Sequence, residues 1–370
     1  MEKGKAPPSS LGNRISRLLT TGATVRRVLN LARTELQYRA GSVRVTGVPP
    51  AIFVDPACLC NLRCPLCFIG RKLPGRKRGL MTMETFRSIV DQVARDALVI
   101  HLYIRGEPLL NPQVFEMIAY AKAAGLKTAM STHFSVFQED LADNLIDSGL
   151  DGLTLSIDGA TPETYSHYRI GGDFERVMTN LGTLIARKRA RKASNPEIEW
   201  QYLAFRHNIH EIAAARSRAH AMGVRFTVLQ GLLGGPGYEP FTGEHDPALV
   251  DKWIAPPEAL RHHLDPQLLG GPLFFDYQDE HYLNSHRCIF LWKTAYFNWD
   301  GSLSPCCFVY DAAHDYGNVH EAPLPVLRNN EHFLAARSLF LPPGSSRRSW
   351  PETICFHCHM YRTNSPLHLE

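Results

Sequence analysis

Strand-like and helical segments alternate strictly between residues 51 and 230 of this 370-residue chain. The strand-like segments are short apolar runs, at 51–55, 98–104, 128–131, 153–157, 198–205 and 224–230. The segments between them carry apolar residues at helical spacing, at 83–95, 112–124, 138–148, 174–192 and 209–222. Strict alternation predicts an α/β fold with parallel strands and right-handed crossovers. A barrel and a flat doubly wound sheet both satisfy it.

Start and stop signals support these helices. Thr82 is placed to cap the first helix, and Gly125, Gly149 and Gly223 follow the second, third and last. Serine and threonine satisfy free amides at helix starts, and glycine adopts the left-handed conformation that ends many helices.

Three cysteines follow the first strand. Cys60, Cys64 and Cys67 have the spacing C-x3-C-x2-C. Four-iron clusters are usually held by four thiolates, so three ligands leave one iron open, as catalytic metal sites keep an open position. A structural zinc site with Cys58 as fourth ligand is the alternative. That arrangement crowds four thiolates into ten residues, so we favour the iron–sulfur interpretation and treat Cys58 as a bystander.

This loop, with Leu66 directly before its last cysteine, resembles the signature of the radical S-adenosylmethionine (SAM) superfamily. The resemblance implies a partial (β/α)6 barrel, and it places Leu66 among the cofactor-binding residues. It also implies a 4Fe–4S cluster whose open iron binds the amino and carboxylate groups of SAM. One electron from that cluster would cleave SAM to a 5′-deoxyadenosyl radical, which abstracts a substrate hydrogen.

The segment Arg105-Gly106-Glu107-Pro108 after the second strand resembles the Gly-Gly-Glu-Pro motif of the family. In that motif the glutamate and nearby backbone groups bind the amino group of SAM, so Gly106 and Glu107 are expected to do so here. Arg105 stands where the family has its first glycine, which leaves the backbone geometry there open. The alternative for Glu107 is an ordinary turn carboxylate that faces water.

The fourth strand ends with a polar row, in which Thr154, Ser156 and Asp158 share one face. In a barrel this face points inward, where polar groups need partners. The resemblance assigns Ser156 to the SAM ribose. Arg169, further along the chain, could pair with the SAM carboxylate or form a structural ion pair.

A second cysteine pattern lies near the C-terminus. Its members are Cys288, Cys306, Cys355 and Cys358, with a predicted strand at 289–299, a hairpin turn at Asp300-Gly301 and a return at 302–306. The pattern resembles the SPASM/Twitch auxiliary-cluster region. A full SPASM domain carries seven cysteines, so the resemblance implies the shorter Twitch form, with these four cysteines holding one 4Fe–4S cluster.

Two alternatives remain open at this second site. Cys307 lies next to Cys306 and competes with it as a ligand, although the spacing from Gly301 favours Cys306. A zinc ribbon is also built from hairpin cysteines and a C-x2-C pair.

A cluster with four protein ligands has no open position, so its expected role is electron transfer. We therefore expect a radical SAM oxidoreductase whose auxiliary cluster accepts an electron in the net oxidation of a small polar substrate, such as a sugar or an aminocyclitol. Peptide modification, epimerisation and bond formation are alternatives. A non-catalytic iron–sulfur redox or sensing protein is a further one, but it has no need of the amino-group pocket that Gly106 and Glu107 predict.

Composition excludes several classes of function. With 44% hydrophobic and 21% charged residues, the chain has an ordinary soluble composition. Nine cysteines without an export signal indicate metal binding rather than disulfides, and no apolar run is long enough to span a membrane. The prediction is a cytoplasmic protein.

Net charge is +4, and basic residues gather at 71–72 and 76–78, after the cysteine loop. They form either a solvated face or a docking surface for an acidic electron donor such as flavodoxin or ferredoxin. Nucleic-acid binding is not expected, because no aromatic platform or helix-turn-helix accompanies the charges.

Four regions follow from these observations. The first is an N-terminal helical extension, in which apolar residues alternate with arginines between residues 14 and 39 and are expected to pack on the domain rather than on a membrane. The regions are 1–48 for this extension, 49–230 for the radical SAM barrel, 231–287 for a linker or cap, and 288–370 for the auxiliary-cluster module.

Overall fold

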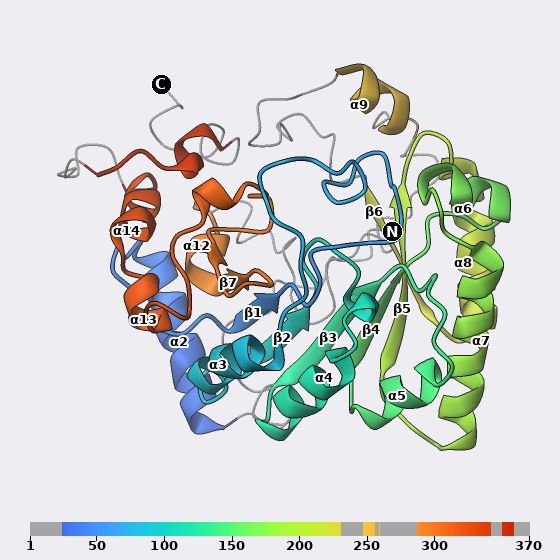
Figure 1. Ribbon diagram of the computed structural model, residues 1–370, viewed down its shortest axis with the longest axis horizontal. Coiled ribbons are helices and arrows are strands. Elements are labelled where there is room, and N and C mark those ends of the chain that lie inside the picture. The colour runs from blue at the N-terminus through green and yellow to red at the C-terminus, as the bar shows by residue number, and fades with distance from the viewer. Residues whose placement is uncertain (1–23, 231–246, 256–258, 260–286, 342–349, 359–370) are drawn as a thin grey trace, which may run out of the picture.

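The strands in the described part of the chain form one curved sheet (Figure 1). The computed structural model describes residues 24–230, 247–255, 259, 287–341 and 350–358. The sheet order is β6-β5-β4-β3-β2-β1-β7-β8. The strands are β1 Ala51–Val54, β2 Val99–Leu102, β3 Lys127–Thr132, β4 Gly152–Ser156, β5 Glu197–Ala204, β6 Arg225–Gln230, β7 Thr294–Phe297 and β8 Leu303–Ser304.

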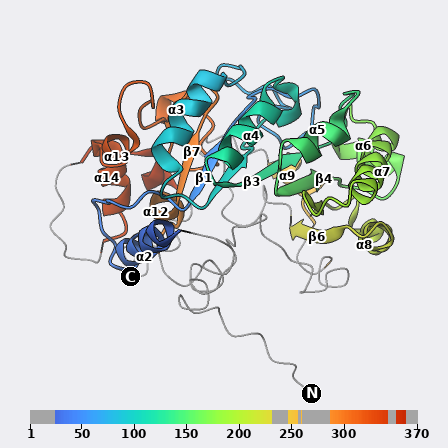
Figure 2. The ribbon, with the colours of Figure 1, turned by 90° about the horizontal axis from the view of Figure 1, so that it is seen from below.

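The strand order decides between the two predicted architectures. Strands β1 to β6 lie side by side in sequence order and are all parallel, without the reversal of order that a doubly wound sheet contains. The helices that connect them lie along the outer side of the curve (Figure 2). The predicted partial barrel is therefore confirmed.

The predicted helices between the strands all form, with ends that differ by a few residues. They are α3 Met83–Val93, α4 Val114–Ala123, α5 Leu141–Asp147, α7 Phe174–Ala190 and α8 Ile212–Ala221. Thr82 caps α3, and Gly125, Gly149 and Gly223 have positive φ. Helix α6, Pro162–Tyr168, was not predicted, although Thr161 caps it and Pro162 occupies its first turn.

The N-terminal helix packs differently from the prediction. Helix α2, Val25–Arg39, leaves Val25, Leu29 and Leu36 more than 60% exposed. Its buried face is mostly polar and includes Asn30, whose amide donates to the Val48 and Asp96 carbonyl groups. The expectation that the apolar residues of this helix pack on the domain is wrong for these three. The part of the predicted segment before residue 24 lies outside the described residues.

The C-terminal region extends the barrel sheet. Strand β7 pairs in parallel with β1, and β8 returns antiparallel to β7 through a turn in which Gly301 has φ +81°. The predicted strand 289–299 is wrong in its first part, because residues Phe290–Lys293 form the short helix α12. Helices α13, Leu324–Leu327, and α14, Glu331–Ser338, follow.

Most of the predicted linker 231–287 lies outside the described residues. Within it the structure describes helix α9, Pro247–Trp253, and an isolated bridge between Ile254 and Phe205. Every helix in the described ranges is too short or too polar to cross a lipid bilayer.

Gly182 and Gly223 both have room for a side chain but differ in backbone conformation. Replacing each by alanine therefore tests whether Gly223 is needed to end α8. A Cβ added to Gly182, inside α7, or to Gly223, after α8, meets nothing within 4 Å, but Gly223 has φ +70°. We expect Gly223→Ala to lower the free energy of unfolding by roughly 1 kcal/mol, because L-residues are strained in this conformation. Gly182→Ala should raise it by roughly 0.5–1 kcal/mol. Urea denaturation followed by circular dichroism measures both, and shifts of the same sign would contradict the assignment of Gly223.

Candidate functional site

The three loop cysteines lie together after β1. Cys60, Cys64 and Cys67 pack in one group with Leu62, Leu66 and Tyr168. Burial raises the pKa of Cys60 to about 12 and that of Cys64 to about 11. Metal ligation requires the thiolate, so a metal centre bound by these cysteines would have to displace the thiol protons.

Cys58 has other charged neighbours than Cys60 and Cys64. Its thiol is surrounded by Asp55, Arg105 and Arg76, and burial raises its pKa to about 12. Cys58 nevertheless packs in one group with Ile69 and Tyr310, and Cys60 and Cys67 contact that group. The role of Cys58 as a bystander stays a prediction.

The loop after β2 lies directly against the cysteine loop. The Glu107 amide donates to the Leu59 carbonyl at 2.9 Å. A Cβ on Gly106 would lie 1.7 Å from the Ala57 carbonyl oxygen, so no side chain fits there. Gly106 is thus explained by the close approach of two backbones.

Glu107 is enclosed rather than exposed to water. It is 1% exposed, and its Oε1 accepts hydrogen bonds from Thr132 Oγ1 at 2.6 Å and from the Leu109 amide at 3.0 Å. Its Oε2 accepts from the His133 amide at 3.0 Å and lies 3.2 Å from His133 Nε2. The alternative of a turn carboxylate facing water is therefore wrong. Burial lowers the pKa of His133.

Arg169 forms the structural ion pair that was one of its two predicted roles. Its Nη2 lies 2.6 Å from Asp158 Oδ2, and Asp158 is fully buried. Burial raises the pKa of Asp158, and the Arg169 charge opposes that rise. The same guanidinium faces the Cys64 thiol and lowers its pKa against the larger effect of burial. Arg169 thus connects the buried carboxylate with the cysteine group.

The polar row of β4 faces the same way as polar residues of β5. Thr154 Oγ1 donates to Glu199 Oε2 at 3.2 Å, and Ser156 lies opposite Gln201 in the strand register. Glu199 is fully buried and its Oε1 also accepts from Thr227 on β6 at 2.8 Å. The predicted inward-facing polar row therefore has partners at Thr154, while Ser156 is half-buried on the same strand.

Sequence reasoning missed His101 and Glu199 on this inner face. His101 stacks on Phe53 with 4.3 Å between ring centroids and contacts Tyr103 edge-on at 5.6 Å. Both imidazole nitrogens are buried without a hydrogen-bond partner, and burial lowers the pKa of His101 to about 3. A neutral imidazole with free nitrogens can meet a polar ligand. The signal for Glu199 was the alternation of polar and apolar residues along β5, whereas His101 is a single polar residue in the apolar strand β2.

The four cysteines predicted to hold the auxiliary cluster line one small cavity. They are Cys288, Cys306, Cys355 and Cys358, together with Phe290, Leu291, Pro305, Phe308 and Phe340. Burial raises the pKa of Cys306 far above its usual value and that of Cys355 to about 12. Cys307 does not line the cavity and has Arg105 and Tyr296 as neighbours instead. The geometry therefore groups Cys306, not Cys307, with the other three.

The arrangement of these thiols around a cavity fits a multi-iron cluster better than a single metal ion. No group of three or more His, Cys, Asp or Glu side chains in the described parts of the chain converges tightly enough to hold a metal ion. A four-iron cluster binds each thiolate at a different iron, so cysteines around a cavity suit it without converging on one point.

The basic group after the cysteine loop is only partly available to a partner. Arg76 is 7% exposed, and its Nη2 lies 2.7 Å from Asp315 Oδ1. The expectation of a solvated or docking face is therefore wrong for Arg76, which is a buried link to the C-terminal region. Arg71, Lys72 and Lys77 are exposed.

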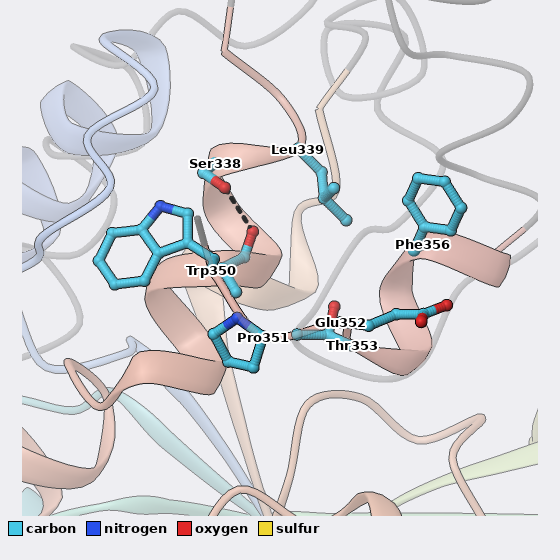
Figure 3. Close-up of a pocket in the computed structure, with 8 residues that line it drawn as sticks. Ser338, Leu339, Trp350, Pro351, Glu352, Thr353 and Phe356 are labelled. Atoms are coloured by element: carbon cyan, nitrogen blue, oxygen red, sulfur yellow. Dashed lines mark hydrogen bonds between the residues drawn. The ribbon is translucent and has the colours of Figure 1, made fainter. Parts of the chain in front are cut away.

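A second pocket lies on the outside of the C-terminal region, between α14 and the segment that leads to Cys355 (Figure 3). It is lined by Ala335, Ser338, Leu339, Trp350, Pro351, Glu352, Thr353 and Phe356. Thr353 also hydrogen-bonds the Cys355 sulfur and lowers the pKa of that thiol. The pocket thus reaches the neighbourhood of the cysteine cavity.

Comparison with known proteins gives two domain matches. Residues 55–191 match the radical SAM superfamily, and residues 288–359 match SPASM, an iron–sulfur cluster-binding domain. The chain is 29% identical over 182 residues to the AdoMet-dependent heme synthase of Methanosarcina barkeri, covering 49% of this chain and 50% of that protein. It is 27% identical over 266 residues to the PqqA peptide cyclase of Ruegeria pomeroyi, covering 70% and 67%. It thus spans about half the length of the first of these relatives.

Among solved structures, Streptococcus suis SuiB bound to S-adenosylmethionine superposes with a TM-score of 0.62 at 14% identity, covering 95% of this chain and 80% of that one. This likeness supports the fold. The chain therefore carries a radical SAM domain followed by a SPASM-type iron–sulfur cluster-binding domain. SAM and two iron–sulfur clusters are the cofactors that follow, and the second domain match favours iron over the zinc-ribbon alternative.

The adjacent cysteines make a matched pair for testing the auxiliary site. We expect Cys306→Ser to lose about half of the iron bound per chain, because one of two four-iron clusters loses a ligand. Cys307→Ser should keep all of it. Iron analysis after anaerobic reconstitution measures both, and the opposite pattern would assign the ligand to Cys307.

Proposed function

We propose that this chain is a radical SAM oxidoreductase with a SAM-binding cluster on Cys60, Cys64 and Cys67. In this proposal Cys288, Cys306, Cys355 and Cys358 hold the auxiliary cluster. The observation that carries it is the enclosed Glu107 carboxylate beside a group of three cysteines, of which Cys64 is buried and Cys60 and Cys67 are half-buried. When bound, SAM and the clusters supply a hydrogen-abstracting radical and an electron acceptor for a net oxidation.

The residues around the cysteine loop bind and orient SAM. Glu107 offers its negative charge to the SAM ammonium, and its bonds to Thr132 and His133 hold the carboxylate in place. Arg169, which pairs with Asp158, is proposed to bind the SAM carboxylate as well. Ser156 is proposed to contact the SAM ribose, and Leu66 is proposed to contact the cofactor.

The inner face of the barrel supports a small polar substrate, of the sugar or aminocyclitol class. His101 is neutral and has free nitrogens, and Tyr103, Ser131 and Gln201 are half-buried. Groups of this kind hydrogen-bond hydroxyl and amino groups and fix their orientation. An acidic electron donor, such as flavodoxin or ferredoxin, would meet the exposed basic residues after the cysteine loop.

A peptide substrate is the second candidate. The match to the PqqA peptide cyclase covers 70% of this chain, which is more of the chain than the heme synthase match covers. Deuterium transfer separates the two candidates. Transfer from a carbon-deuterated aminocyclitol into 5′-deoxyadenosine supports the first substrate class, and transfer from a deuterated peptide supports the second.

SAM cleavage tests the enzyme assignment. With a strong reductant and SAM, the reconstituted protein should release 5′-deoxyadenosine even without substrate, as an uncoupled reaction. Cys64→Ala should release none, because the open iron is lost with the cluster. Release of S-adenosylhomocysteine alone from protein with intact clusters would instead indicate methyl transfer.

A substitution at Glu107 distinguishes a SAM-binding enzyme from a redox protein that does not bind SAM. A charge-assisted hydrogen bond is worth roughly 1.5–3 kcal/mol, so Glu107→Gln should weaken SAM binding about ten- to a hundredfold. Gln keeps the size of the side chain, but its amide nitrogen faces one of the backbone amides, at Leu109 or His133, that donate to Glu107. Thr132→Val is the matched control, because it removes one support of the carboxylate and leaves the charge. Anaerobic titration calorimetry measures both, and unchanged affinity in Glu107→Gln with full iron content would rule out the assigned SAM site.

A further inference from the structure

Two arginines are buried in the C-terminal region without an acidic partner. Arg328, which follows α13, is 3% exposed, and Arg337, in α14, is fully buried. Among the residues that the structure describes, no carboxylate pairs with either. Their side chains donate hydrogen bonds only to backbone carbonyl groups: Arg328 to Gly47, Leu291 and Trp292, and Arg337 to Leu291, Val43 and Arg328. The Arg337 guanidinium also lies over the rings of Phe333 and Trp292, 5.2 Å and 6.0 Å from their centroids.

This arrangement differs from that of other buried cations in the same chain. Arg76 pairs with Asp315, Arg169 with Asp158, and Lys293 with Glu35. Burying an unpaired charge is costly, which is why such charges normally have counter-charges. Desolvation accordingly lowers the pKa of Arg328 to about 9 and that of Arg337 much further, with Arg328 adding to the effect. Two adjacent cations without a described counter-charge call for an anion nearby.

The short helix α12 connects these cations to the cysteine cavity. The Leu291 carbonyl accepts from Arg328 Nη2 at 3.1 Å and from Arg337 Nε at 3.1 Å. The same Leu291 lines the cavity with the four cysteines. The amides of Leu291 and Phe290 donate to the Cys288 sulfur and lower its pKa against the larger effect of burial. The segment Phe290–Leu291 thus accepts hydrogen bonds from both guanidinium groups through the Leu291 carbonyl, and it donates hydrogen bonds to the Cys288 thiol through its amides.

We propose that Arg328 and Arg337 are positioning residues that supply the buried positive charge for an anionic auxiliary cluster and raise its reduction potential. This rests on the proposed function, in which the four cavity cysteines hold that cluster. Four thiolates on a four-iron cluster leave a net negative charge, which grows on reduction. Net charge and hydrogen bonds to the sulfurs set such potentials, and fixed cations in a low-dielectric interior favour the more negative state. The arginines thereby make the cluster a better electron acceptor.

The test uses the full chain with Cys60, Cys64 and Cys67 replaced by Ala, so that only the auxiliary cluster is observed. An iron content of about four per chain shows that this cluster is present before any potential is measured. Its absence would refute the ligand assignment of the proposed function, separately from the role of the arginines. The potential is then measured by redox titration with electron paramagnetic resonance.

Two substitutions at Arg337 distinguish the effect of its charge from the effect of its hydrogen bonds. Arg337→Gln, which keeps a donor but not the charge, should lower the ratio of reduced to oxidised cluster at a fixed potential about tenfold, equal to about 59 mV for one electron. Arg337→Lys, which keeps the charge, should stay near the parent value. The exposed Arg87, which pairs with Glu116 on the protein surface, gives the control Arg87→Gln, for which no shift is expected. The same pair of changes at Arg328 repeats the test independently.

Each outcome decides the proposal. Loss of the cluster from Arg337→Gln but not from Arg337→Lys would support it, because the charge is then required. An unchanged potential in Arg337→Gln and Arg328→Gln would overturn it. Loss of the cluster from the Gln and Lys variants alike would also overturn it, because the guanidinium hydrogen bonds would then matter rather than the charge.

Discussion

The contact between two backbones at Gly106 is the constraint on which the site depends. The loop after β2 approaches the cysteine loop so closely that a single Cβ at Gly106 would collide with the Ala57 carbonyl. Strands β1 and β2 are adjacent and parallel, so the two loops leave the sheet side by side. Because Glu107 follows Gly106 directly, the same contact fixes the enclosed carboxylate relative to the thiol group that begins at Cys60. The sheet brings these loops together, and the missing side chain sets their separation.

Buried charge pairs then position distant segments relative to one another. Arg76 and Asp315 join the end of the cysteine loop to the C-terminal region, and Glu35 and Lys293 join α2 to α12. Removing one partner of such a pair costs roughly 3–5 kcal/mol, since it leaves a buried charge uncompensated. A buried pair adds little net stability, but a fold in which its two segments were not in contact would leave a charge buried without a partner. Arg328 and Arg337 depart from this pattern, because no carboxylate among the described residues pairs with them.

Sequence patterns predicted the barrel well because each strand is short, apolar and bounded by a helix signal. They failed where tertiary contacts decide. Residues Phe290–Lys293 are as apolar and aromatic as a strand, but α12 is held by arginines that lie far along the chain. The spacing of the second cysteine group favoured Cys306, and only the fold shows that Cys307 is directed elsewhere. His101 was missed because a single polar residue in a strand belongs to no motif.

Arg105 explains the departure from the Gly-Gly-Glu-Pro motif. Its side chain is almost completely buried, and its Nη1 donates to Asn298 Oδ1 at 2.5 Å while its Nη2 donates to the Val309 carbonyl. Both partners belong to the C-terminal region, which pairs with β1 through β7. A glycine at this position could make neither bond. Arg105 therefore links the predicted SAM-binding loop to the region that carries the second cysteine group. Because Glu107 lies in the same loop, this link fixes the position of the first site relative to the second.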